Sequence, residues 1–98
     1  MINGITTISP KGGILHHYHN CEESVVVLSG TGIAVVGKTE LAVETGDVTR
    51  IPVNLPHQFR NGSDSDNMSS FWTYSSAGTT RTTVGTGETH LIDAEHKA

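Results

Sequence analysis

The sequence is poor in charged residues, in aromatic residues and in cysteine. Charged residues make up 16% and aromatic residues 5% of the 98 residues, and Cys21 is the single cysteine. One cysteine cannot form an intramolecular disulfide, which excludes the small secreted domains that depend on such bonds. The six Lys and Arg residues are scattered and the formal net charge is -4, so we expect neither nucleic acid nor an anionic membrane as a partner.

Long hydrophobic runs are also missing. The longest apolar runs, such as Val25–Leu28, contain four residues, far fewer than a membrane span needs. The first residues, Met1–Ile8, lack the basic start and apolar stretch of a signal peptide. Together with the single cysteine, these features lead us to expect a cytoplasmic protein.

The residue types that are abundant favour β-structure. The sequence holds eleven Gly, thirteen Thr and six His, whereas the strong helix formers Ala, Leu and Lys are scarce. Thr and Val suit strands, and Gly suits the turns between them. A chain of this length buries enough surface for one modest core, so we expect a single all-β domain over residues 1–98.

Turn signals recur at short intervals, a pattern typical of a sandwich or barrel. Seven or eight short strands are expected, over Ile14–His19, Ser24–Leu28, Ile33–Val36, Leu41–Glu44, Val48–Ile51, His57–Arg60, Ser70–Tyr74 and Thr80–Val84. The polar stretch 61–67 is the clearest loop. From about residue 85 we expect a polar C-terminal tail with one turn of helix around Asp93–His96.

Four residues of the sequence could together bind a metal ion: two histidines, a glutamate and a third histidine. His17 and His19 are two apart in an expected strand, so both imidazoles point to the same face. Glu23 begins the next strand, and His57 lies beyond a proline turn. Three imidazoles and a carboxylate suit Mn, Fe, Co, Ni or Zn. Taken singly, each of these residues has a simpler interpretation. His17 and His19 would lie on a polar strand face, Glu23 in a solvated acidic turn, and His57 would be a surface imidazole.

The spacing of these residues resembles that of the cupins, which carry two motifs. The first reads H-x-H, three or four residues, Glu, six residues and Gly, and it matches His17–Gly30. The second reads Gly, five residues, Pro-x-Gly, two residues, His, three residues and Asn, and it matches Gly46–Asn61. The two motifs span about half of the chain.

The resemblance implies a fold and a metal site. The implied fold is a small double-stranded β-helix, or jelly-roll, barrel. The implied cofactor is one divalent transition metal ion, with Mn, Fe, Ni, Co and Zn all open. By the same resemblance its ligands are His17, His19, Glu23 and His57.

The chain departs from the family pattern at two positions. The glycine expected before the first motif falls on Lys11, which suggests a locally adjusted turn. The glycine of Pro-x-Gly is Asn54, and Asn is the residue that best replaces Gly where a positive φ is needed. Neither position is one of the four implied ligands.

Three further residues are expected near a substrate. Phe59, two residues after His57, should share its inward face and line a pocket. Arg50 could bind a substrate carboxylate from the barrel wall, although an outward, solvated arginine is equally compatible with the sequence. In the aromatic cluster, Phe71 alternates with Trp72, so one of the two lines the barrel, and we place Phe71 in the substrate site.

The remaining histidines and the cysteine are not assigned a functional role from the sequence. His16 should face away from His17, on the outer surface or in a subunit contact. Cys21 is expected to be an inert filler, although a thiolate near the ligands could coordinate a metal. His90 and His96 lie in the polar tail and are expected to be surface imidazoles.

The family resemblance determines the reaction less closely than the fold, because cupins include dioxygenases, decarboxylases, isomerases and lyases besides members that only bind. We expect a metal-dependent enzyme that acts on a small oxygenated organic substrate. The alternative is a non-catalytic module that binds or senses a small molecule in the barrel. A small barrel with apolar outer strands also leads us to expect a homodimer.

Overall fold

The computed structural model describes residues 1–14, 16–76 and 78–91, which form strands and turns without a helix. Its ten strands are β1 (Ile2–Ile8), β2 (His17–His19), β3 (Glu23–Ser29), β4 (Thr31–Val36), β5 (Thr39–Glu44), β6 (Val48–Ile51), β7 (His57–Asn61), β8 (Met68–Tyr74), β9 (Thr80–Thr83) and β10 (Thr89–Leu91). The expected all-β fold is confirmed.

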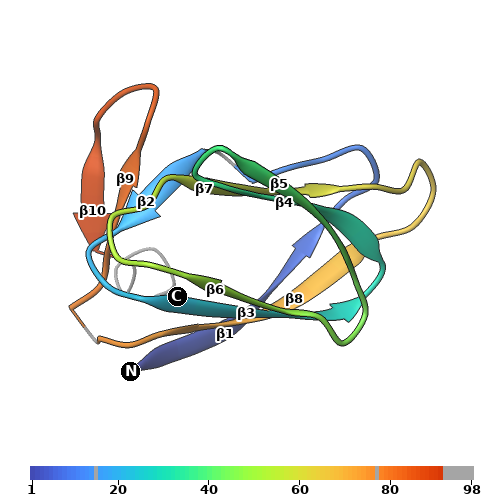
Figure 1. Ribbon diagram of the computed structural model, residues 1–98, viewed down its shortest axis with the longest axis horizontal. Coiled ribbons are helices and arrows are strands. Elements are labelled where there is room, and N and C mark those ends of the chain that lie inside the picture. The colour runs from blue at the N-terminus through green and yellow to red at the C-terminus, as the bar shows by residue number, and fades with distance from the viewer. Residues whose placement is uncertain (15, 77, 92–98) are drawn as a thin grey trace.

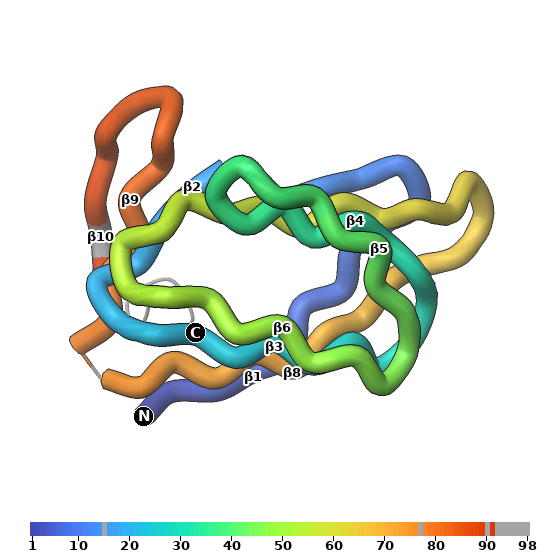
Figure 2. The backbone as a smooth tube through the Cα atoms, in the orientation of Figure 1, coloured from blue at the N-terminus to red at the C-terminus, as the bar shows by residue number. Residues whose placement is uncertain are grey.

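The strands form two antiparallel sheets that face each other (Figure 1). One sheet has the order β1-β8-β3-β6 and the other the order β10-β9-β2-β7-β4-β5. The backbone therefore passes from one wall to the other and encloses an elongated barrel (Figure 2). Side chains on the two inner faces meet between the sheets and form the core.

Alternation along the strands fills the barrel with apolar side chains. In β8 the burial alternates along the whole strand, and β3 shows the same period from Glu23 to Val27. The buried apolar residues come from both sheets and are Ile8, Val25, Val27, Ala34, Val43, Ile51, Phe59, Met68, Trp72 and Tyr74. The two walls are thus joined by one continuous core.

Strand β1 was not predicted from the sequence. Its seven residues mix polar and apolar types on both faces, so no alternating pattern marks it. It forms because it pairs with β8 over its full length. Gly4 lies opposite Trp72 in this ladder, and a Cβ at Gly4 would come within 2.5 Å of the Trp72 ring. The indole Nε1 donates a hydrogen bond to Thr6 Oγ1 at 2.8 Å, which fixes the ring across β1.

The two residues that stand where the family motifs have glycine both have a positive φ. Asn54 has a φ of 60° and Lys11 a φ of 61°, and these are the only non-glycine residues with positive φ in the described part of the chain. The prediction for Asn54 is confirmed. At Lys11, where a locally adjusted turn was expected, lysine itself adopts the left-handed conformation. Gly30 and Gly46, at the corners of the motifs, have φ values of 88° and 93°.

The C-terminal part of the chain differs from the expectation of a polar tail. Strand β10 lies within that segment and pairs antiparallel with β9. The helical turn expected around Asp93–His96 lies outside the described residues. At the other end of the motif region, β2 is shorter than the strand expected from Ile14 and contains only His17–His19.

Candidate metal centre

The structure brings three histidines together on the inner face of one sheet. His17 and His19 come from β2, and His57 from the neighbouring strand β7, where it pairs directly with His17. All three side chains are buried, with exposures of 1–3%. Their ligand atoms all lie within 4.8 Å of one another. Three imidazoles at this spacing could hold one metal ion.

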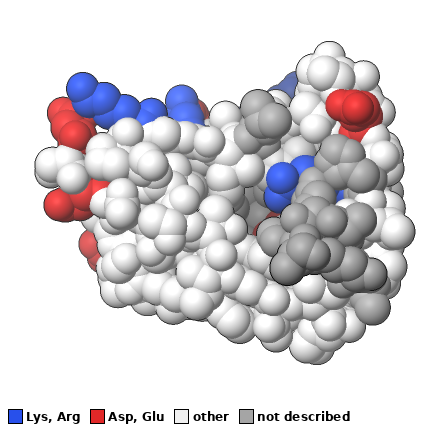
Figure 3. All heavy atoms as spheres, turned by 180° about the vertical axis from the view of Figure 1, so that it is seen from behind, with Lys and Arg blue, Asp and Glu red and all other residues white. Residues whose placement is uncertain are grey.

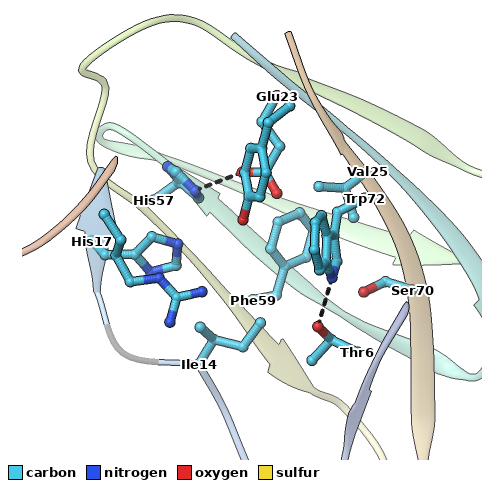
Figure 4. A pocket seen from close by; sticks show the side chains of 11 residues that line it. Thr6, Ile14, His17, Glu23, Val25, His57, Phe59, Ser70 and Trp72 are labelled. Carbon is cyan, nitrogen blue, oxygen red and sulfur yellow. Dashed lines mark hydrogen bonds and ion pairs between the residues drawn. The ribbon is translucent and has the colours of Figure 1, made fainter. Parts of the chain in front are cut away.

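Glu23 reaches the same point from the opposite wall of the barrel. It begins β3 in the four-stranded sheet, and its exposure is 6%. Its Oε1 lies 3.0 Å from His57 Nε2 and 3.4 Å from His19 Nε2. Figure 4 shows the contact between Glu23 and His57, with His17 on the same side of the cavity. Closure of the barrel therefore places a carboxylate against the histidines.

The outer nitrogens of two histidines determine how the rings are oriented. His19 Nδ1 lies 3.0 Å from the Thr80 carbonyl oxygen, and His57 Nδ1 lies 2.9 Å from that of Leu55. A carbonyl oxygen can only accept, so each Nδ1 carries a hydrogen and donates it. In a neutral ring this leaves Nε2 as a lone-pair donor aimed into the site, the arrangement in which histidines bind metals.

The inward atoms of this group need a cation between them. His19 Nε2, His57 Nε2 and Glu23 Oε1 are buried and have no hydrogen-bond partner apart from their contacts with one another. With both rings neutral, lone pairs of two nitrogens and a carboxylate oxygen would face each other at 3.0–3.4 Å. Such a group is stable only with a proton or a metal ion between its members. The donor set fits a divalent transition metal.

The charge state of Glu23 agrees with a role as a metal ligand. Burial raises the pKa of this carboxyl, but hydrogen bonds and charge interactions with His19 and His57 outweigh burial and lower the pKa from 4.5 to about 2. Glu23 is therefore a carboxylate at neutral pH. A buried carboxylate is costly without a positive partner, and a cation bound by the histidines would be such a partner.

A small cavity of about 30 Å³ adjoins the histidines. Its walls come from both sheets and consist of Thr6, Ile14, His17, Glu23, Val25, His57, Phe59, Ser70, Trp72, Tyr74 and Arg81. Most of these side chains surround the same space in Figure 4. Phe59 is among them, as its alternation with His57 predicted. The space beside the histidines is thus enclosed mainly by apolar and aromatic groups.

Comparison with known proteins decides the family. Residues 4–74 match the family model described as "Cupin domain". The chain belongs to the cupin family. The matched region contains both motifs, all three histidines of the cluster and Glu23.

Solved structures similar to this cupin share its jelly-roll fold. A cupin-2 domain from Rhodospirillum rubrum has a TM-score of 0.68 at 22% identity and covers 91% of this chain and 54% of its own. A predicted oxalate decarboxylase from Thermotoga maritima has a TM-score of 0.70 at 18% identity, with 74% and 64% covered. The salicylate 1,2-dioxygenase of Pseudoaminobacter salicylatoxidans has a TM-score of 0.68 at 14% identity, with 74% and 19% covered. At these identities the likeness establishes the fold alone.

A curated relative matches a shorter part of this cupin. The uncharacterized protein y4oW of Sinorhizobium fredii is 42% identical over 41 residues, which are 42% of this chain and 19% of y4oW. This cupin thus spans about a fifth of the relative's length. In the described part of the chain, no helix has the length and apolar character needed to cross a membrane.

The structure places two of the expected substrate residues of this cupin outside the cavity. Arg50 is exposed, and its guanidinium pairs with Glu22 at 2.8 Å on the outer surface. The expectation of an inward Arg50 is corrected, because Arg50 alternates with the buried Ile51 and shares the outer face with its register partner Ser24. Phe71 is also corrected: it lies on the outer face of β8, and Trp72 takes the inward position instead.

Sequence reasoning missed a basic residue in the cavity wall. Arg81 lies opposite His19 in the ladder between β2 and β9, and it is the only Lys or Arg among the described residues that line the cavity. From behind, the molecule shows a hollow in which Lys or Arg atoms are visible (Figure 3). No sequence signal separates Arg81 from the other scattered basic residues, because its position depends on strand pairing.

The remaining singled-out residues lie mostly as expected. His16 is exposed, which agrees with its predicted outward direction. Cys21 is half-buried against the core, and its Sγ lies 3.1 Å from Thr79 Oγ1. It is absent from the potential metal ligands found among the described residues. His90 lies in β10, and His96 is outside the described part of the chain.

Proposed function

We propose that this cupin binds one divalent transition metal ion through His17, His19, Glu23 and His57. The observation that carries the proposal is the convergence of buried lone-pair donors at 3.0–3.4 Å from two opposite sheets. The Nδ1 contacts of His19 and His57 with carbonyl oxygens support it, because they turn Nε2 of both rings towards the site. Mn, Fe, Ni, Co and Zn are all compatible with this donor set.

We propose further that the chain is an enzyme for a small oxygenated organic substrate, of the dioxygenase, isomerase, decarboxylase or lyase type. A bound metal ion of this class supplies Lewis-acid stabilisation of negative charge on a substrate oxygen. The protein's own part is to enclose and orient the substrate. Phe59, Trp72 and Val25 limit access of water to the cavity, while Ser70 and Tyr74 provide polar groups at its wall.

A non-catalytic module that binds or senses a small molecule is the second candidate. The observation that favours it is the composition of the cavity wall. Apart from the four proposed ligands, the described residues that line the cavity include no His, Cys, Asp, Glu or Lys side chain. A general acid or base would then have to be supplied by the substrate or by a proposed ligand.

Metal analysis of the purified native protein is the decisive first experiment. We expect about one transition metal ion per chain, and a redox metal would favour oxygen chemistry over isomerisation or binding. Oxygen uptake and turnover would then be measured with candidate substrates. A protein that retains no transition metal and gains no activity with added Fe, Mn or Ni would contradict the enzyme proposal. A small molecule that raises the melting temperature without turnover would support the binding module.

We also propose that the chain forms a homodimer through the outer face of the four-stranded sheet. Four apolar side chains form a cross-strand row there, because Ile5 pairs with Phe71, Phe71 with Val26, and Val26 with Val48. Ile5 and Val48 are each 63% exposed. A cytoplasmic location stays a prediction from the sequence.

A further inference from the structure

We propose that Asn20 is a positioning residue of the proposed metal site, because it holds the backbone segment whose carbonyl orients the His19 ring. The inference rests on the proposed function, in which His19 is a metal ligand. Asn20 is exposed and follows the last residue of β2. It occupies a position that the first motif leaves open to any residue type, so the motif gives it no role. Its role comes from the place where β2 stops pairing with β9.

The rings of His19 and His57 are oriented by acceptors of different kinds. The Leu55 carbonyl that accepts from His57 Nδ1 lies two residues away in the chain, so a local turn is enough to place it. The Thr80 carbonyl that accepts from His19 Nδ1 lies 61 residues away. Thr80 begins β9, the first strand after the chain crosses from the four-stranded to the six-stranded sheet. The orientation of His19 therefore depends on a contact between distant segments.

Backbone pairing between β2 and β9 stops one position before Thr80. The last pair of this ladder is His19 with Arg81, and the next position in the same register would pair Asn20 with Thr80. The Asn20 side chain takes the place of the backbone there. Its Oδ1 accepts from the Thr80 N–H at 2.9 Å, and its Nδ2 donates to the Gly78 carbonyl at 3.3 Å. The Asn20 amide thus fixes the start of β9 beside the end of β2.

Thr80 connects the Asn20 amide to the His19 ring. Its N–H donates to Asn20, and its carbonyl oxygen accepts from His19 Nδ1 at 3.0 Å. Without the amide, the Thr80 N–H would donate to water, and the Thr80 carbonyl would be free to move away from the ring. His19 Nε2 would then point towards the metal for a smaller fraction of the time. Partners that orient a metal-binding imidazole typically account for roughly 10–100-fold in metal affinity.

The first experiment measures metal affinity. Co²⁺ binding to the wild type and to Asn20→Ala would be followed by the visible absorption of the metal and by competition with a chelator. We expect Asn20→Ala to bind Co²⁺ about 10-fold more weakly, at the lower end of the range for an outer-shell partner, because Asn20 acts on His19 through Thr80.

Thr82→Val is the matched control, because it removes a side-chain hydrogen bond from the same strand and leaves the Asn20 contacts in place. Thr82 Oγ1 lies 2.7 Å from Thr89 Oγ1 of β10. This variant should bind Co²⁺ like the wild type. Equal Co²⁺ affinity in the wild type and Asn20→Ala would overturn the inference. An equal loss of affinity in Asn20→Ala and Thr82→Val would also overturn it, by reducing Asn20 to general support of β9.

The second experiment observes the His19 ring itself in the metal-free protein. Hydrogen exchange of the Nδ1–H protons of the rings would be followed in ¹H–¹⁵N spectra. In Asn20→Ala we expect the His19 proton to exchange roughly 5–10-fold faster than in the wild type, the effect of losing one ordinary hydrogen bond. The His57 proton should be unchanged, because its acceptor lies in a local turn. Asn20→Asp should restore part of the slow exchange, since it keeps an oxygen that can accept from the Thr80 N–H.

The exchange measurement separates this inference from the proposed function. If the wild type binds no Co²⁺, the proposed metal site is wrong, whereas faster exchange at His19 in Asn20→Ala would still support the positioning role. Unchanged exchange at His19 in Asn20→Ala would overturn that role. Exchange that becomes faster to the same extent at His19 and His57 would overturn it as well, because it would show a general loosening of the barrel.

Discussion

The rings of His19 and His57 are oriented by hydrogen bonds at Nδ1, and this orientation supports the proposed metal site. Each Nδ1 donates to a backbone carbonyl at 2.9–3.0 Å, so the lone pair of Nε2 is directed inwards. The Leu55 carbonyl that accepts from His57 belongs to the Pro52–Leu55 turn. Asn54 in the same turn donates its N–H to the His19 carbonyl at 2.8 Å. The turn thus connects the two ligand strands.

Replacement of one proposed ligand should weaken metal binding sharply. His57→Ala removes an inward nitrogen, and we expect metal affinity to fall by about 100-fold or more, since loss of an outer-shell partner alone costs roughly 10–100-fold. His16→Ala is the control, because His16 is exposed next to the site in sequence. Metal content and competition with a chelator would be measured for both. Equal metal content in the two variants would contradict the assignment.

Metal affinity should decrease as the pH is lowered from 7 to 5. Imidazole binds metal only when neutral, and its ordinary pKa is about 6.5, so protons compete with the metal in this range. Glu23 does not add to this loss. Its pKa is lowered to about 2, so the contribution of its carboxylate is present above pH 4.5 and is lost only as the pH falls towards 2. Chelator competition at a series of pH values tests this, and a constant affinity between pH 7 and 5 would refute it.

Lys11 and Asn61 connect the turn after β1 to the loop that follows β7. Lys11 holds a left-handed conformation in the turn after β1, where its N–H donates to the Ser63 carbonyl at 3.1 Å. The adjacent Asn61 ends β7 and donates from its amide to the carbonyls of Ile8 and Asp66 at 3.0 and 2.7 Å. Asn61 thereby links the end of β1 to the loop that follows β7. This explains structurally why the second motif ends in asparagine.

Lys11→Gly should stabilise the protein. A left-handed backbone costs a side chain about 1–2 kcal/mol, and the greater chain entropy of glycine offsets about 0.5–1 kcal/mol of the gain. We expect a net gain of about 0.5–1 kcal/mol, or roughly 2–8 °C in melting temperature. Lys38→Gly is the control, because Lys38 is exposed in a turn without a positive φ, and it should destabilise. A melting temperature of Lys11→Gly at or below that of the wild type would contradict this account.

The proposed ligands join the two walls of the molecule. Three come from the six-stranded sheet and Glu23 from the four-stranded sheet, so the site exists only when the barrel is closed. Arg81 belongs to β9, further along the same wall as β2 and β7. The proposed metal site, the cavity and the core therefore depend on the same packing between sheets. Binding and folding should be linked for that reason.

Metal should raise the melting temperature of the whole protein. A ligand at 100 times its dissociation constant stabilises the folded state by about 2.7 kcal/mol, which corresponds to roughly 10–20 °C for a domain of this size. Thermal unfolding of metal-free protein with and without added Co²⁺ or Ni²⁺ measures the effect. His57→Ala should show a much smaller shift. Equal shifts in both proteins would place the bound metal elsewhere.

The apolar row on the outer face predicts the assembly state. Gel filtration at micromolar concentration should give a dimer for the wild type, and Val48→Lys should give a monomer, because a charge buried in an apolar contact is costly. Leu41→Lys is the control, since Leu41 is also exposed but lies on β5 in the other sheet. A monomeric wild type, or a dimeric Val48→Lys, would count against the proposed interface.

Much of the fold was accessible from local patterns. Alternation and turn residues predicted eight of the strands approximately, and the motif spacing selected the three histidines that the structure brings together. Strand β1 escaped prediction because neither of its faces is uniformly apolar; its pairing with β8 holds it in place. Strand β10 was not predicted either, because its short sequence has no strand pattern of its own and forms a strand by pairing with β9.

The residue sequence alone establishes which side chains share a strand face, because alternation is a property of the extended backbone. It cannot establish which face is inward. Phe71 and Trp72 were therefore equivalent until the sheets packed and buried Trp72. Arg81 entered the cavity through its pairing with His19, a contact between distant parts of the chain. Such pairings arise from cooperative burial of the whole core. For that reason the sequence predicted the proposed metal ligands from their spacing, but it did not predict all of the residues that line the cavity.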